Sequence, residues 1–163
     1  MDGEGRPTAI LYNIIGEEPC CNRDETEVGI KMCTCFGCGD SLWNEAISAG
    51  ASIGDANRDG HGDAFRHCYG SCKIARNCGR VCASVLGWGH EIWEHAVWFS
   101  SGQMDIHNNS QGREVASSKT DCATGCLDLL YGGRLRVDNQ EVTPRSRGEA
   151  EEKLKESGLL GKR

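Results

Sequence analysis

A carboxylate and an imidazole stand four residues apart in the segment DAFRH, residues 63–67. If this segment is helical, Asp63 and His67 share one face, because positions i and i+4 lie one above the other on a helix. An Asp–His pair of this kind can act as an oriented general base or can supply two metal ligands. We therefore expect His67 to be a base or a ligand that Asp63 orients, with Arg66 pointing away from the pair.

The segment that leads into this pair, DANRDGHGD, has the alternating oxygen ligands of a calcium-binding loop. Calcium prefers hard oxygen ligands on alternate residues, with a glycine at the sharp turn. The pattern resembles thrombospondin type 3 and dockerin-like loops. Arg66 stands where the bidentate acid of such a loop belongs, and the alternative is a plain turn in which Asp63 caps the next helix. The predicted metal ligands are Asp55, Asn57, Asp59, His61 through its backbone carbonyl, and Asp63.

Two further acid–imidazole pairs at helical spacing occur in HEIWEH, residues 90–95. His90 pairs with Glu94, and Glu91 pairs with His95. The segment matches neither of the zinc-protease motifs that place two histidines four residues apart. We predict that His90 and Glu91 complete a metal or acid–base centre, and the alternative is an exposed helix with internal charge pairs.

A fourth group of polar side chains lies in MDIHNNSQGR, residues 104–113. Asp, His and Asn are set more closely here than an ordinary loop requires. We expect Asp105 to join the centre and Asn108 and Asn109 to orient a substrate, because adjacent amides can hold a reacting group. The alternative is that the two asparagines cap a helix.

Cysteine spacing indicates how the helices are joined. A helix from Asp63 to about residue 86, with a break allowed near Gly79, gathers four cysteines on one arc: Cys68, Cys72, Cys78 and Cys82. Cys122 and Cys126 repeat the spacing of four on a later helix. Two such helices running antiparallel could be cross-linked twice, although sequence does not give the pairing. A total of 11 cysteines leaves one free, paired between chains or used in chemistry.

The remaining elements are predicted from turn residues and capping signals. We expect a disulfide-pinned loop over 20–40, a helix over 41–49, a turn over 87–89 and a helix over 90–99. A loop over 100–104 and a turn-like segment over 105–113 follow. Asp138-Asn139 is the predicted turn of a small hairpin. After Pro144 we expect an exposed helix in a solvated tail, which divides the chain into a helical domain over 1–140 and a polar tail over 141–163.

Composition limits the class of protein. With 163 residues, 22 glycines and few large aliphatic side chains, the chain suits one helical domain stapled by cysteines. A formal charge of −6 argues against a general nucleic-acid binder, and no apolar run is long enough for a membrane span. No signal peptide is visible in MDGEGRPT, yet the cysteine density favours an oxidising, secreted or extracellular setting.

Three of these motifs, taken in order, resemble an uncharacterised bacterial domain. They are DAFRH with Tyr69 two positions on, HE at 90–91, and MD-x-HNN-x2-GR. That domain occurs at the C-termini of RHS/YD-repeat, wall-associated and other polymorphic-toxin-like proteins. The resemblance covers about residues 60–115 and implies a mainly helical, effector-like enzyme with an immunity-type protein partner, without naming a reaction. Carried over residue by residue, it points to Asp63, Arg66, His67, His90, Glu91, Asp105, Asn108, Asn109 and Arg113.

A weaker resemblance is to secreted phospholipase A2. The R-H-D-x-G-Y motif of its bacterial members is echoed by residues 66–70, and its calcium loop is echoed by CTCFGCGD at 33–40. Cys68 stands where the calcium-binding aspartate of that family belongs, which weakens the match at the position most needed for its mechanism.

Together these patterns predict a mainly α, disulfide-linked domain that is a small exported hydrolase of unknown substrate. The predicted catalytic residues are Asp63, His67, His90, Glu91 and Asp105, and the predicted substrate-binding residues are Arg66, Asn108, Asn109 and Arg113. Calcium is the expected cofactor, ahead of another divalent metal such as zinc. The alternatives are a calcium-binding module without enzymatic activity and a phospholipase-like lipid hydrolase.

Overall fold

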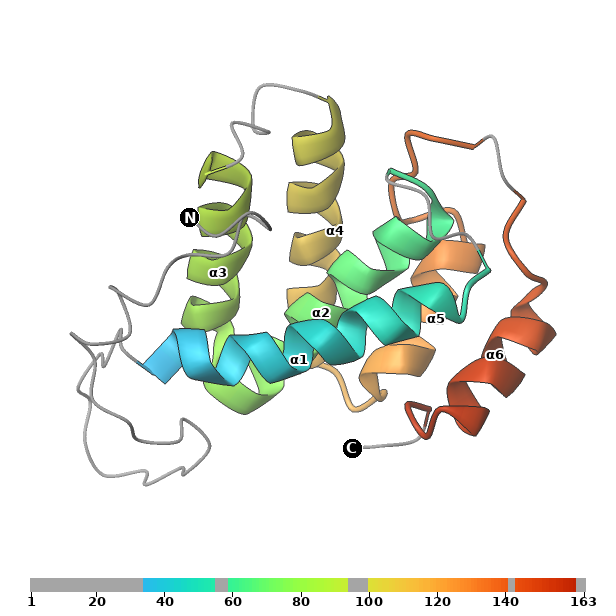
Figure 1. Ribbon diagram of the computed structural model, residues 1–163, viewed down its shortest axis with the longest axis horizontal. Coiled ribbons are helices and arrows are strands. Elements are labelled where there is room, and N and C mark those ends of the chain that lie inside the picture. The colour runs from blue at the N-terminus through green and yellow to red at the C-terminus, as the bar shows by residue number, and fades with distance from the viewer. Residues whose placement is uncertain (1–33, 55–58, 94–99, 141–142, 161–163) are drawn as a thin grey trace, which may run out of the picture.

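Helices provide all the regular structure in the part of the chain that the computed structural model describes, residues 34–54, 59–93, 100–140 and 143–160. For residues 34–38, 40, 88–93, 100 and 101 the backbone alone is described. The elements are α1 (Thr34–Ala51), α2 (His61–Cys78), α3 (Arg80–Trp93), α4 (Ser100–Ala116), α5 (Cys122–Tyr131) and α6 (Arg147–Glu156) (Figure 1). The predicted mainly α, disulfide-linked fold is confirmed.

Helix α2 is the centre of this arrangement, and it contacts α1, α3, α4 and α5. Most of its side chains are buried, among them Phe65 and Tyr69. It ends at Gly79, whose φ of +91° lies in the region that glycine adopts without strain. The break predicted near Gly79 is therefore confirmed. Because α2 and α3 are separate helices, the single arc of four cysteines that a continuous helix requires does not form.

Helices α2 and α4 meet at backbone contact. A Cβ atom on Gly112 of α4 would lie 2.1 Å from the carbonyl oxygen of Cys68 and 3.1 Å from the backbone nitrogen of Cys72. No side chain larger than hydrogen fits at such distances. Gly112 therefore sets how closely α4 approaches α2.

The structure corrects the prediction for the segment that became α4. Residues 100–116 form one helix, so the predicted loop over 100–104 and turn over 105–113 are wrong. The described buried residues of α4 are Gly102, Met104, Asn108, Asn109, Gly112 and Val115. Two of these six are large and apolar, so the periodic apolar pattern that reveals an amphipathic helix is missing.

The predicted turn over 87–89 and the predicted helix start at His90 are also wrong, because α3 runs through both. Gly87 allows α3 to pack closely against α4. A Cβ atom at that position would lie 3.2 Å from the side-chain nitrogen of Asn109 on α4. A glycine inside a helix is tolerated where a neighbouring element comes this close.

The predicted double cross-link is confirmed and joins α2 to α5. Cys68 is bonded to Cys126 and Cys72 to Cys122, with Cα–Cα distances of 5.9 and 5.8 Å. Cys78 and Cys82 are disulfide-bonded as well. The other cysteines lie outside the described side chains: Cys20, Cys21, Cys33, Cys35 and Cys38.

The two ends of the described chain differ from prediction. Helix α1 begins at Thr34, so the predicted loop over 20–40 is wrong for residues 34–40, and the helix predicted to begin at residue 41 begins earlier. Helix α6 buries Ala150 and Leu154 in the same apolar cluster as Phe65, so it is not a solvated tail. Residues 134–140 contain no strand, and the rest of the predicted hairpin includes residues 141–142, which lie outside the described part.

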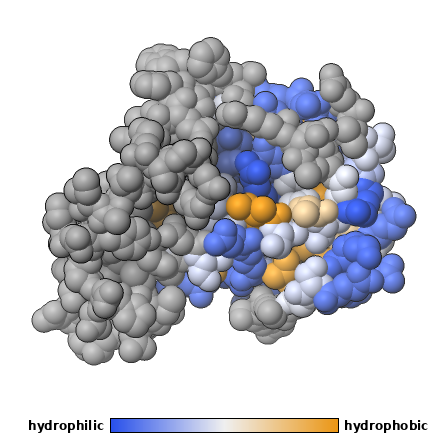
Figure 2. Space-filling model, in the orientation of Figure 1, coloured by the Kyte–Doolittle hydropathy of each residue, from blue (hydrophilic) through white to orange (hydrophobic). Residues whose placement is uncertain are grey.

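Figure 2 shows that hydrophilic residues dominate the described surface on one face, where hydrophobic residues are confined to small patches. Among the described residues, no helix combines the length and the apolar character that crossing a membrane requires.

Candidate metal or acid–base centre

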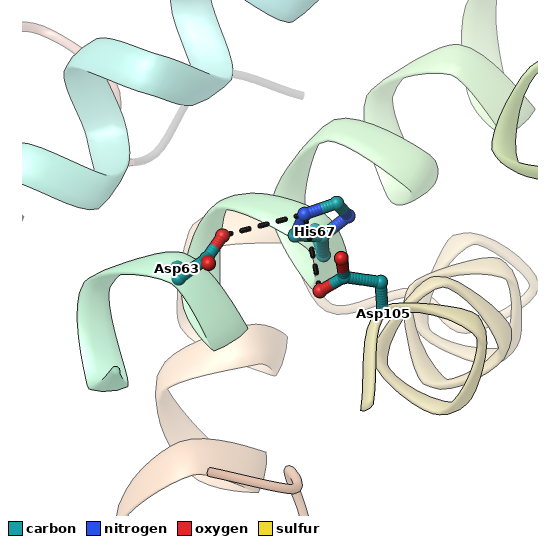
Figure 3. A group of neighbouring side chains, drawn as sticks. All are labelled: Asp63, His67 and Asp105. Carbon is teal, nitrogen blue, oxygen red and sulfur yellow. Dashed lines mark ion pairs between the residues drawn. The ribbon is translucent and has the colours of Figure 1, made fainter. Parts of the chain in front are cut away.

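Three side chains from two helices converge between α2 and α4 (Figure 3). The Nε2 atom of His67 lies 3.3 Å from Oδ1 of Asp63 and 3.2 Å from Oδ1 of Asp105. One ligand-type atom from each residue lies within 4.8 Å of the other two. From the predicted catalytic set, the structure thus brings together Asp63, His67 and Asp105.

This cluster is withdrawn from solvent. The side chains of His67, Asp63 and Asp105 are 1%, 2% and 13% exposed. Within the described residues, neither ring nitrogen of His67 makes a hydrogen bond of acceptable geometry. Trp43 of α1 meets the imidazole edge-on, with 5.3 Å between ring centroids. A buried polar atom without a hydrogen bond costs roughly 1–3 kcal/mol, so such an arrangement in a folded protein calls for a functional reason.

Asp63 is held by its own helix. It lies in the first turn of α2, where the positive end of the helix dipole favours a carboxylate, and its Oδ2 accepts a 2.6 Å hydrogen bond from the Asp59 backbone N–H. Burial alone would raise the pKa of Asp63, but His67, Arg66 and the Asp59 N–H outweigh it and lower the pKa below its ordinary value. Asp63 is therefore ionised inside the cluster at neutral pH.

The direction predicted for Arg66 is wrong. Its Nη2 lies 2.8 Å from Oδ1 of Asp63, and its guanidinium lies over the Trp43 ring at 5.7 Å from the centroid. Residues i and i+3 are also neighbours on a helix, and a long arginine side chain can bend back to an acid in the preceding turn. Arg66 thus belongs to the cluster as the partner of Asp63.

The residues of the predicted calcium loop are only partly described. Asp55 and Asn57 lie outside the described residues. Asp59 has a φ of +64°, and its carbonyl oxygen accepts hydrogen bonds from the backbone N–H groups of Asp138 and Asn139 at 3.1 and 2.8 Å. Asp63 faces His67 and does not cap α2, whose N-cap is Gly60. The calcium loop stays a prediction.

Asn108 holds the chain that follows α5. Its Nδ2 donates to the carbonyl oxygen of Arg136 and its Oδ1 accepts from the Arg136 backbone N–H, each at 2.9 Å. The exposed His107 contacts the carbonyl oxygen of Arg134 at 3.1 Å. Asn108 thus holds the backbone on both sides of Arg136, which is a structural role. Its role in orienting a substrate stays a prediction.

The other predicted substrate-binding residues on α4, Asn109 and Arg113, have neighbours on α3. Asn109 is buried against Gly87 of α3. Arg113 is half-buried, and burial together with the neighbouring Arg80 lowers its pKa. From the segment 104–113, Asp105 forms an ion pair with His67.

Two predicted residues of the centre stand in α3 without described side chains. His90 and Glu91 belong to the last turn of that helix, which contacts both α2 and α4. Glu94 and His95 lie outside the described residues. Participation of His90 and Glu91 in the centre therefore stays a prediction.

Sequence reasoning missed Trp43, which contacts both His67 and Arg66. Its position in the helix predicted over 41–49 offered no signal, because an aromatic residue on a helix face usually marks the core. The disulfide of Cys68 with Cys126 also bears on the second resemblance. A bonded sulfur at this position cannot take the place of a calcium-binding carboxylate.

The model of a family described as a domain of unknown function, DUF6973, matches residues 42–129. The matched region runs from α1 to α5 and contains Trp43, Asp63, Arg66, His67 and Asp105. No solved structure gives a significant match to the chain.

Proposed function

The chain belongs to the DUF6973 family, and we propose that it is a small hydrolase whose reacting centre is the Asp63–His67–Asp105 cluster. The observation that carries this proposal is the convergence of two carboxylates and one imidazole from separate helices at a buried point. Desolvating ionisable groups is costly, and clusters of this kind concentrate at functional sites.

The chemistry that suits the cluster is activation of water. Each of the three facing atoms can accept a proton or bind a cation, and one positioned base or one bound cation is enough to activate an attacking water. Asp105 is the least buried of the three, so water and substrate would reach the centre on its side. Hydrolysis of an ester, an amide or a phosphoester would use such a centre in the same way.

The proposed setting is outside the producing cell. Cross-links between α2 and α5 form and persist in oxidising compartments. Together with the resemblance of three motifs to polymorphic-toxin-like proteins, they support a role as an exported effector that an immunity-type protein would neutralise. The substrate class stays open.

A substrate panel tests the hydrolase. Untagged, oxidised protein is incubated with chromogenic carboxylic esters, phosphodiesters and peptide amides, and with bacterial cell-wall fragments. We expect turnover of one class, reduced at least about 100-fold by His67→Gln, because losing a positioned acid–base group or ligand costs about that much. His107→Ala is the matched control, since this exposed histidine lies outside the cluster. Folded wild type that turns over none of these substrates, or a His67→Gln enzyme as active as wild type, contradicts the proposal.

A further inference from the structure

We propose that Asp63, His67 and Asp105 together bind one divalent transition-metal ion, with Zn²⁺ or Mn²⁺ as the best-suited ions. The ligand atoms are Oδ1 of each carboxylate and Nε2 of the imidazole. The catalytic use of the ion rests on the proposed function, whereas its binding does not.

The spacing of the three atoms fits ligands around one ion. Bonds from zinc to histidine nitrogen and carboxylate oxygen are about 2.0–2.2 Å long, which places neighbouring ligand atoms about 3.0–3.5 Å apart in octahedral and tetrahedral sites. His67 Nε2 lies 3.3 and 3.2 Å from the two oxygens. Both distances therefore match the edges of a coordination polyhedron.

The bonding of His67 supplies a second, independent observation. Its ring is 1% exposed, and within the described residues neither nitrogen makes a hydrogen bond of acceptable geometry, although Nε2 faces two carboxylate oxygens. A ring N–H points in one direction and can serve one oxygen well. An ion placed between the three atoms would bind Nε2 and both oxygens at once, and its positive charge would offset that of the carboxylates.

Arg66 and Asp59 support the site from outside the first layer of ligands. Arg66 Nη2 lies 2.8 Å from the same Oδ1 of Asp63, and the Asp59 N–H donates to Oδ2. A carboxylate oxygen has two lone pairs, so Oδ1 can contact the guanidinium through one and an ion through the other. Partners of this kind orient a ligating carboxylate and are a regular part of metal sites.

The ligand set selects the kind of ion. Calcium takes six to eight oxygen ligands, and magnesium keeps most of its waters, so a buried imidazole suits neither. Two carboxylates and one imidazole suit zinc and manganese, and affinity for zinc is usually the higher. Three protein ligands leave coordination positions open for water, as in catalytic rather than structural zinc sites. This site shares Asp63 with the predicted calcium loop, whose other ligands come from residues 55–61.

Calorimetry tests the site without a substrate. The full untagged chain, with disulfides intact and any free thiol alkylated, is stripped with EDTA and titrated with ZnCl₂, MnCl₂ and CaCl₂. We expect one equivalent of zinc or manganese to bind and calcium to bind at least about tenfold more weakly. Asp105→Asn should weaken binding at least about 100-fold, because loss of a direct ligand exceeds the 10- to 100-fold cost of losing an outer partner. His107→Ala should bind as wild type does.

A thermal melt covers the case in which a variant folds poorly. Saturating zinc should raise the Tm of wild type and His107→Ala, and should leave the Tm of Asp105→Asn unchanged. Folded wild type that binds neither zinc nor manganese overturns the proposal, and so does equal affinity in Asp105→Asn. Metal binding without turnover of any substrate would contradict the proposed hydrolase activity but not the metal site. Turnover by metal-free protein would contradict the catalytic use of the ion and leave its binding to the calorimetric test.

Discussion

Side chains from three helices surround His67. Asp63 comes from the same helix, Asp105 from α4, and the indole of Trp43 from α1. The distance from His67 to Asp105 depends on how closely α4 approaches α2. That approach is set seven residues after Asp105, where Gly112 touches the backbone of Cys68. A residue with no functional group therefore controls the geometry of the centre.

Replacing Gly112 with alanine should push α4 away from α2. The added Cβ would lie 2.1 Å from the Cys68 carbonyl oxygen and 2.9 Å from its carbonyl carbon, which are backbone atoms with little freedom to move. We expect Gly112→Ala to lower the free energy of unfolding by about 3 kcal/mol, the upper part of the usual cost of overpacking. Metal affinity should fall with it, because Asp105 moves with α4. Urea unfolding and zinc titration measure the two effects.

Gly148→Ala is the matched control for this change. Gly148 is an exposed residue of α6, and nothing lies within 4 Å of where its Cβ would be. The same substitution should therefore stabilise the fold by about 0.4–1 kcal/mol, because alanine restricts the unfolded chain more than glycine does. Equal effects at the two positions would contradict the role of Gly112 as the contact between α2 and α4.

At the scale of elements, sequence predicted best where the signal is local. The helices that became α2 and α5, and their double cross-link, followed from cysteines spaced by four. Helix α4 did not, because Asn108 and Gly112 replace apolar residues on its buried face. The Asp63–His67 pair was predictable from spacing within one helix. The contact of Arg66 with Asp63 is also local, at spacing i, i+3, and was overlooked. The contact of Trp43 with His67 depends on packing between α1 and α2, which no local pattern encodes.

Helix α6 begins with a complete capping box. Ser146 and Glu149 form a capping box, in which Glu149 Oε2 accepts hydrogen bonds from the Ser146 hydroxyl at 2.7 Å and from the Ser146 N–H at 3.0 Å. These two bonds lower the pKa of Glu149 below its ordinary value of 4.5. The ionised form is therefore favoured in the folded protein.

The pH dependence of stability should follow from this shift. A carboxyl with a depressed folded pKa contributes stability above its unfolded pKa, and the contribution is lost as pH falls through the folded pKa. Wild type should have a higher Tm than Glu149→Gln at neutral pH, and the gap should close as pH drops below 4.5. Glu152→Gln removes the same charge from an exposed position on the same helix and should show no such gap. A gap for Glu149→Gln that persists unchanged in acid would contradict the prediction.

The whole molecule compensates for a core made largely of small side chains. Ala46, Ala49, Ala64, Ala123 and Ala150 are fully or nearly fully buried, and alanine buries little apolar area. The two disulfides add stability by restricting the unfolded chain. They span 58 and 50 residues and are nested, so each closes nearly the same long loop. The first bridge should contribute about 4 kcal/mol, and the second, which then closes a ring of about ten residues, about 3 kcal/mol.

Removing the bridges one pair at a time and then together tests this account. Cys68→Ala with Cys126→Ala, or Cys72→Ala with Cys122→Ala, should cost about 3 kcal/mol, because the remaining bridge still closes the long loop. Removing both pairs should cost about 7 kcal/mol, which is comparable to the whole stability of a small domain. We expect each single-pair variant to fold and to bind zinc, and the variant without either pair to lose both properties. Circular dichroism in increasing urea, followed by zinc titration of each variant, separates these outcomes. If the variant without either pair unfolds at the same urea concentration as wild type, the disulfides do not hold the site together. The proposed dependence of the fold on an oxidising compartment would then be wrong as well.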